Sequence, residues 1–174
     1  MALIAEELVE EWLNQQKYFT IRNLKSGQNE IDLLGVKLNG KSKNQLVHVE
    51  VMVSHSPMSW ICRINLRGAG GRSQEEIKSE VDAWVEKKYK SETKQLMRSN
   101  LIPHTNTDDW GMMFVHGVLI DRNHEELEYM KELGINIISI KKIMLELQEN
   151  DGNVLTGGNG REISNLISIY ENLE

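Results

Sequence analysis

Cysteine and proline are the scarcest structural signals in this sequence, which has one cysteine and two prolines in 174 residues. The single cysteine, Cys62, excludes an intramolecular disulfide and a cysteine-rich zinc site. No signal-peptide pattern and no long apolar run is present, so we expect a cytoplasmic protein that does not enter a membrane. With 40% hydrophobic and 26% charged residues, the composition predicts one globular domain over residues 1–174.

Positive charge is also limited, because the formal net charge is -6. This value argues against a general nucleic-acid coat protein, although an enzyme needs only a local basic surface. Residues 54–100 carry nine Lys/Arg and six Asp/Glu, a local charge of +3, so the rest of the chain carries -6 minus +3, or -9. The basic charge is therefore concentrated in one region.

The N-terminal part of the sequence predicts a helix followed by three strands. Residues 3–17 place Leu8, Trp12 and other apolar residues on one helical stripe. Residues 18–24 and 30–36 have the pattern of a hairpin. Residues 45–53 alternate strictly, with valines on one face, which predicts a third strand.

The remainder alternates between helical and strand patterns, so we expect an α/β fold with a mixed sheet between helices. On the helix expected over 74–90, Ile77, Val81, Trp84, Val85 and Lys88 lie on one side, and we interpret Lys88 as a lysine that extends its aliphatic stem over this apolar side. The core is expected over about 3–140 and a helical extension over about 141–174. The predicted elements are a helix over 74–90, a strand over 111–120, a helix over 124–133 ended by Gly134, a strand over 135–140, and helices over 141–148 and around 163–170.

A glycine-containing basic segment separates the third strand from the second major helix. Residues 54–73 contain Arg63, Arg67 and Arg72 but no acidic residue, which is typical of a long surface loop. Arginines spaced along such a loop can bind phosphates through paired N–H groups. The same residues can also serve only to keep the loop soluble, and the sequence favours neither interpretation.

Two acidic residues are expected to face each other on neighbouring strands. Asp32 lies on the second strand, while His48, Glu50 and Met52 share one face of the third. Opposed residues on adjacent strands have Cβ atoms about 4.5–5.5 Å apart, a spacing at which two carboxylates can share a divalent cation. The alternatives are two exposed strand acids and, for His48, a hydrogen-bonded packing residue.

Four short motifs in this order resemble the archaeal Holliday junction resolvases and related small bacterial proteins of the PD-(D/E)XK nuclease superfamily. They are Ala5-Glu6, Lys25-Ser26-Gly27, Glu30-Ile31-Asp32-Leu33 and Val47-His48-Val49-Glu50-Val51. The resemblance covers about residues 3–120. It implies a restriction-endonuclease-like αβββαβ core that hydrolyses DNA with Mg²⁺ or Mn²⁺, in some members as a homodimer. It also implies that Asp32, Glu50 and Val51 bind the metal and that Glu6, with Glu10 as runner-up, assists.

The sequence departs from this family at Met52, where the motif has a catalytic lysine. Methionine has a similar length but no charge and no proton to donate, so it cannot stabilise a phosphate in the transition state. Another lysine could fill the space, and Lys78 is the preferred candidate, although an ordinary surface lysine is the competing interpretation. Alternatively, the protein is a non-cleaving module that binds nucleic acid or a protein partner, or Met52 was introduced by substitution.

Overall fold

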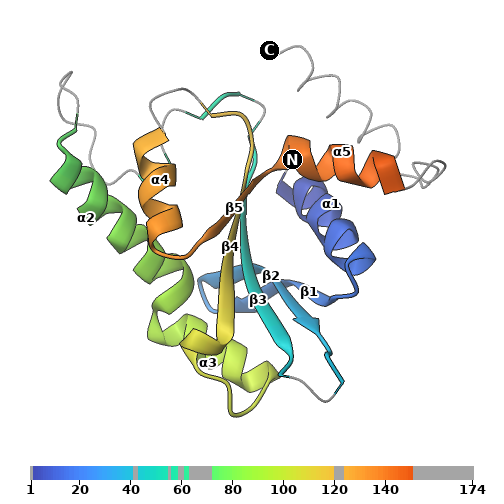
Figure 1. Ribbon diagram of the computed structural model, residues 1–174. Coiled ribbons are helices and arrows are strands. Elements are labelled where there is room, and N and C mark those ends of the chain that lie inside the picture. The colour runs from blue at the N-terminus through green and yellow to red at the C-terminus, as the bar shows by residue number, and fades with distance from the viewer. Residues whose placement is uncertain are drawn as a thin grey trace.

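The computed structural model describes residues 2–40, 43–54, 56–58, 61–62, 72–119 and 124–150. These residues form a five-stranded mixed sheet with helices on both faces (Figure 1). The α/β class predicted from the sequence is therefore confirmed. Within the described ranges, no helix is both long enough and apolar enough to cross a membrane.

The strands lie in the order β1-β2-β3-β4-β5 across the sheet. The first three pair antiparallel, whereas β3, β4 and β5 pair parallel. The predicted hairpin and the predicted third strand are both confirmed. The strand bounds are β1 Phe19–Ser26, β2 Asn29–Lys37, β3 Gln45–Met52, β4 Trp110–His116 and β5 Asn136–Ser139.

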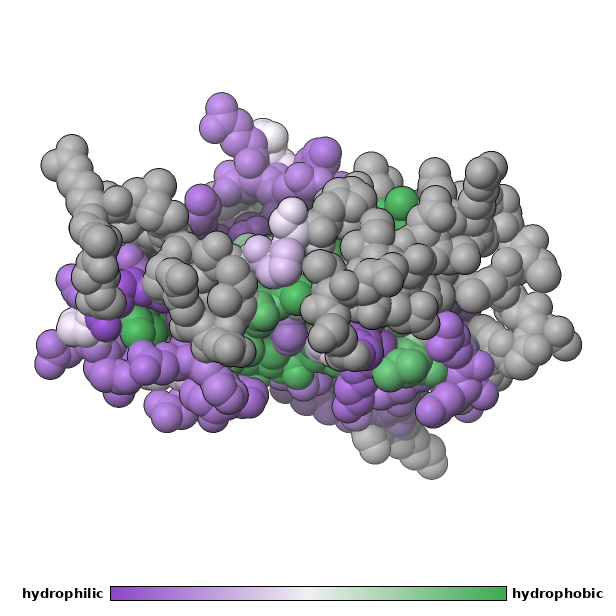
Figure 2. All heavy atoms as spheres, turned by 90° about the horizontal axis from the view of Figure 1, so that it is seen from above, coloured by the Kyte–Doolittle hydropathy of each residue, from purple (hydrophilic) through white to green (hydrophobic). Residues whose placement is uncertain are grey.

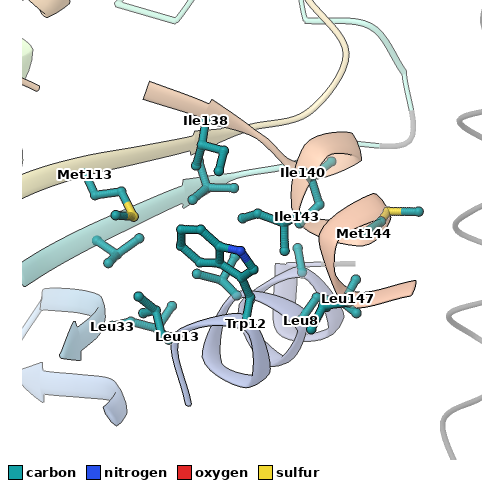
Figure 3. Packing of buried hydrophobic residues seen from close by; sticks show 14 of the residues in the cluster. Leu8, Trp12, Leu13, Leu33, Met113, Ile138, Ile140, Ile143, Met144 and Leu147 are labelled. Atoms are coloured by element: carbon teal, nitrogen blue, oxygen red, sulfur yellow. The ribbon is translucent and has the colours of Figure 1, made fainter. Parts of the chain in front are cut away.

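Two helices, α1 (Ala2–Gln15) and α5 (Ile140–Asn150), cover one face of the sheet. Trp12 lies between them and the strands (Figure 3), and its indole N–H donates to Glu146 at 2.6 Å. The apolar stripe predicted for the first helix is thus the buried one, and burial of such side chains is the main favourable contribution to folding. The predicted helix around 163–170 lies outside the described residues.

The opposite face carries α2 (Gln74–Val85), α3 (Glu92–Leu101) and α4 (His124–Glu132), together with two short helical turns. The helix predicted over 74–90 changes to a π-helix at η1 (Glu86–Lys90), and η2 (Thr107–Asp109) is a 3-10 turn before β4. A helix at α3 was not predicted from the sequence. Its buried face carries the charged residues Lys94 and Arg98, so a search for apolar periodicity does not detect it.

Gly134 ends α4, as the sequence predicts. Its φ is +82°, a left-handed conformation that glycine adopts without a steric penalty. The next residue, Ile135, donates its N–H to the carbonyl of Met130 at 3.1 Å and is buried. This tight reversal brings β5 directly beside β4.

A buried carboxylate and lysine cluster as the candidate functional site

Asp32 lies where the pairing of β2 with β3 ends. The last described pair of that ladder joins Leu33 to Val49. Beyond it, the Asp32 carboxylate accepts the backbone N–H of Val51 at 2.8 Å. Burial and, after it, the negative charge of Glu50 raise the pKa of Asp32 to about 7. The structure therefore brings the two predicted strand carboxylates close enough to interact.

Glu50 is only 1% exposed and receives hydrogen bonds on both carboxylate oxygens. His48 lies 3.1 Å from Oε1 and the Lys94 ammonium 3.3 Å from the same oxygen, while Lys88 lies 2.5 Å from Oε2. Burial alone raises the pKa of Glu50, but the hydrogen bond from His48 and the nearby lysine charges outweigh it. The pKa of Glu50 is therefore below its ordinary value.

Lys88 reaches Glu50 from the π-helical turn η1. The turn is held against the sheet because the hydroxyl of Tyr89 donates to the carbonyl of Met113 at 2.6 Å. On its other side, Arg98 donates to the carbonyl of Tyr89 at 2.7 Å. Single π-turns within helices are frequent at functional sites. Burial lowers the pKa of Lys88, but the Glu50 carboxylate outweighs this effect and raises it.

The lysines that contact Glu50 are Lys88 and Lys94, whereas Lys78 lies elsewhere. Lys78 is exposed, and its ammonium lies 5.2 Å from the ring centroid of Tyr129 on α4. Ten residues of helix separate Lys78 from Lys88, roughly 15 Å along the axis. The sequence contained the relevant signal, because Lys88 occupies the apolar stripe that packs against the sheet. The sequence interpretation covers the aliphatic stem of Lys88, and the structure adds the contact of its ammonium with the buried Glu50 carboxylate.

Lys94 and Arg98 belong to the cluster but were not predicted as site residues. The Lys94 ammonium, nearly fully buried, also donates to the backbone carbonyl of Glu30. Arg98 lies 2.9 Å from the second ring nitrogen of His48. Lys94, Met97, Arg98 and Leu101 have the spacing of one helix face, so cations at helical spacing were the available signal.

Glu6 and Glu10, the two candidates on α1, have different surroundings. Glu6 is 7% exposed, and its Oε2 is buried with no hydrogen-bond partner. Burial and then the charge of Glu30 raise its pKa, and its own charge acts on Asp32. Glu10 instead pairs with Arg22 at 2.7 Å and accepts a hydrogen bond from Thr20. Glu6 is thus the α1 acid with an unused oxygen beside the strand carboxylates.

The donor atoms of this cluster are compatible with a hard divalent cation. No group of three or more His, Cys, Asp or Glu side chains within the described ranges is arranged to hold a metal ion. Mg²⁺ is commonly bound through one or two carboxylates, with water and phosphate oxygens completing its shell. Asp32 and Glu50 supply two carboxylates, and Glu6 has an unpaired oxygen. Val51 contributes its N–H to Asp32, which orients that carboxylate.

Of the three arginines predicted to bind nucleic acid, the structure describes Arg72. Arg63 and Arg67 lie outside the described residues. Arg72 is 16% exposed at its side chain and bridges two carboxylates, those of Glu80 and Glu126, the latter at 2.7 Å. Its guanidinium therefore faces acids within the fold rather than an open surface.

Figure 2 shows the molecule from above the view of Figure 1, with apolar atoms between hydrophilic residues at the edges of the molecule.

No family model matches the chain, and no curated protein matches it. A solved structure with a similar arrangement is that of AF1548, a protein of unknown function, at 12% identity and a TM-score of 0.45. The match covers 80% of this chain and 58% of that chain, and it assigns neither a family nor an activity.

Proposed function

We propose that this protein is a metal-dependent phosphodiesterase that acts on nucleic acid, with DNA as the favoured substrate. In this proposal Lys88 takes the place of the lysine missing at Met52. One observation carries the proposal. The Lys88 ammonium lies 2.5 Å from Oε2 of Glu50, in a cluster where Asp32 interacts with that same carboxylate. Two carboxylates and one lysine that meet on a sheet are the groups needed to bind a cation and a phosphate together.

The proposed roles follow from the surroundings of each group. Asp32 and Glu50 would hold Mg²⁺ or Mn²⁺, with Glu6 contributing through water. The chemistry supplied by such a bound ion is polarisation of a phosphate oxygen and a lower pKa for water. Asp32, whose pKa is about 7, must lose its proton before it can act as a ligand. Cleavage should therefore increase as the pH rises through about 7.

Lys88 is suited to contact a substrate because its side chain is 30% exposed, whereas that of Lys94 is 4% exposed. An ammonium at the surface of the cluster can leave Oε2 of Glu50 and donate to a phosphate oxygen. Met52 is partly buried and packs with the apolar residues of the α2 and α4 face. It can shape the site, but it offers no charge to the transition state.

The decisive experiment moves the lysine from position 88 to position 52. Duplex, branched and single-stranded DNA, and the matching RNA, are incubated with protein and Mg²⁺ or Mn²⁺. We expect the parent to cleave, Lys88→Met to lose at least about 100-fold in rate, and Lys88→Met with Met52→Lys to recover part of it. Lys78→Met is the matched control and should keep the parent rate. Equal cleavage by parent and Lys88→Met would overturn the role of Lys88.

A non-cleaving nucleic-acid-binding module is the second candidate, and one observation favours it. Both oxygens of Glu50 already accept hydrogen bonds from cationic or imidazole groups, so the carboxylate is satisfied without a metal. On this interpretation the parent binds DNA in a salt-dependent manner and cleaves nothing, with or without Met52→Lys. Absence of divalent-ion binding by calorimetry, together with absence of cleavage, would select this candidate.

A further inference from the structure

The ring of His48 has a defined tautomer because of its partner on α3. Arg98 Nη1 lies 2.9 Å from His48 Nδ1, and a guanidinium can only donate. Nδ1 must therefore be the acceptor, which leaves the proton of the neutral ring on Nε2. That nitrogen lies 3.1 Å from Oε1 of Glu50, so His48 donates to the carboxylate. The direction of both hydrogen bonds follows from the chemistry of arginine alone.

The two oxygens of Glu50 consequently differ in their surroundings. Oε1 accepts from His48 and from Lys94, whose side chains are 0% and 4% exposed. Oε2 accepts from Lys88, the partner that reaches solvent. Oε1 is thus held from inside the protein by two buried donors, while Oε2 lies on the open side of the cluster.

We infer that Arg98, acting through His48, is a positioning residue that orients Glu50 so that Oε2 is the oxygen offered to a bound cation. Arg98 also donates to the carbonyl of Tyr89, the residue next to Lys88. A single guanidinium thus sets both the rotation of the Glu50 carboxylate and the place of the turn that carries Lys88. The tautomer of His48 does not depend on the proposed function. Only the statement that Oε2 of Glu50 binds a cation rests on the proposed function.

The first test measures the tautomer in the full-length protein by ¹⁵N–¹H correlation of the histidine rings at neutral pH, with His48→Gln used to assign the signals. We expect His48 to carry its proton on Nε2 only. In Arg98→Met the ring should show a mixture of tautomers, and the ¹³C shift of the Glu50 carboxyl should change. A proton on Nδ1 in the parent, or an unchanged Glu50 signal in Arg98→Met, would overturn the inference.

The second test compares three variants by Mn²⁺ affinity and cleavage rate, with the melting midpoint recorded for each. Glutamine at position 48 offers an oxygen to Arg98 and an N–H to Glu50, whereas leucine offers neither. His48→Gln should stay within about threefold of the parent, and His48→Leu and Arg98→Met should each lose about 10- to 100-fold, as is usual for groups that orient ligands. Equal losses in Gln and Leu variants of equal melting midpoint would contradict the inference.

Failure of the proposed function and failure of the positioning role of Arg98 give different results. If the parent neither binds Mn²⁺ nor cleaves any substrate, the proposed function fails. The ring tautomer and the Glu50 shift still decide whether Arg98 orients the carboxylate. Conversely, an active parent whose His48→Leu variant has unchanged rate and affinity keeps the proposed function and loses the positioning role.

Discussion

Two of the buried glutamates, Glu126 and Glu50, have different partners. Glu126 on α4 is 0% exposed and accepts from the backbone N–H groups of Ile61 and Cys62, at 3.0 and 3.4 Å, and from Arg72. Glu50 on β3 is equally buried, but its partners are all side chains. The first carboxylate joins segments of backbone to a helix, while the second is contacted by two lysines and a histidine.

The balance of charge also separates the two clusters. At Glu126 one arginine is shared with a second acid, Glu80, so the acids outnumber the cation. Around Glu50, two lysines contact one carboxylate, and Arg98 contacts the Nδ1 atom of His48. Replacing a whole buried ion pair by apolar residues is often neutral or favourable, so stability alone does not explain a buried carboxylate with two lysines and a nearby second acid, Asp32. We therefore interpret Glu126 as structural and Glu50 as functional.

The largest expected change is in the structural cluster. Glu126→Ala leaves two backbone N–H groups without their acceptor and removes one of the two carboxylates that Arg72 contacts. We therefore expect the free energy of unfolding to fall by about 3–5 kcal/mol. Urea unfolding followed by circular dichroism measures it. Glu126→Gln retains one acceptor oxygen and should lose less. A loss below about 1 kcal/mol in Glu126→Ala would break the distinction drawn between the two glutamates.

The next prediction concerns Asp32, whose pKa is raised from 3.8 to about 7 in the folded state. Between these values the folded protein binds more protons than the unfolded chain. Its stability therefore decreases as the pH rises through this window. Asp32→Asn keeps an acceptor for Val51 and removes the buried charge, so we expect it to be more stable than the parent by on the order of 2 kcal/mol at pH 8.

The same variant should lose cleavage, because a neutral amide is a poor ligand for a divalent ion. Unfolding of parent and Asp32→Asn is compared at pH 4 and pH 8. The gain in stability should nearly vanish at pH 4, where the carboxyl is largely protonated when folded. A gain of equal size at both pH values would show that the charge of Asp32 is not its source.

A smaller effect on stability is expected for Lys88→Met. Glu50 keeps His48 and Lys94 as donors, and the Lys88 pair is partly exposed, so the free energy of unfolding should fall by only about 1 kcal/mol. Combined with a large loss of cleavage, this identifies Lys88 as functional rather than structural. A loss as large as that in Glu126→Ala would instead place both glutamates in one structural class.

The smallest effect is expected at Lys78, which contributes an exposed contact with the ring of Tyr129. Lys78→Ala should change the free energy of unfolding by less than about 0.5 kcal/mol and leave cleavage unchanged. Parallel unfolding and cleavage assays with Lys88→Met give the comparison. Loss of cleavage in a stable Lys78→Ala protein would reverse the assignment of the two lysines.

Local patterns were sufficient to predict much of the fold. The stripe around Trp12 predicted the first helix, and the alternation over residues 45–53 predicted the central strand. That alternation also put His48 and Glu50 on one face, because side-chain direction in a strand has a period of two residues. The proximity of Asp32 to Glu50 followed from the same period and from the antiparallel pairing of β2 with β3.

Only the tertiary structure decided which cations meet Glu50. Lys88 reaches it from a π-turn that Tyr89 holds against the sheet, and Lys94 does so from a helix whose buried face is charged. Likewise, Arg72 lies beside Glu126, 54 residues away in the sequence. Charged side chains follow no apolar periodicity, and their partners are set by long-range packing. The sequence by itself therefore determined the positions of the acidic residues on the strands. Long-range packing determined which cationic side chains pair with them.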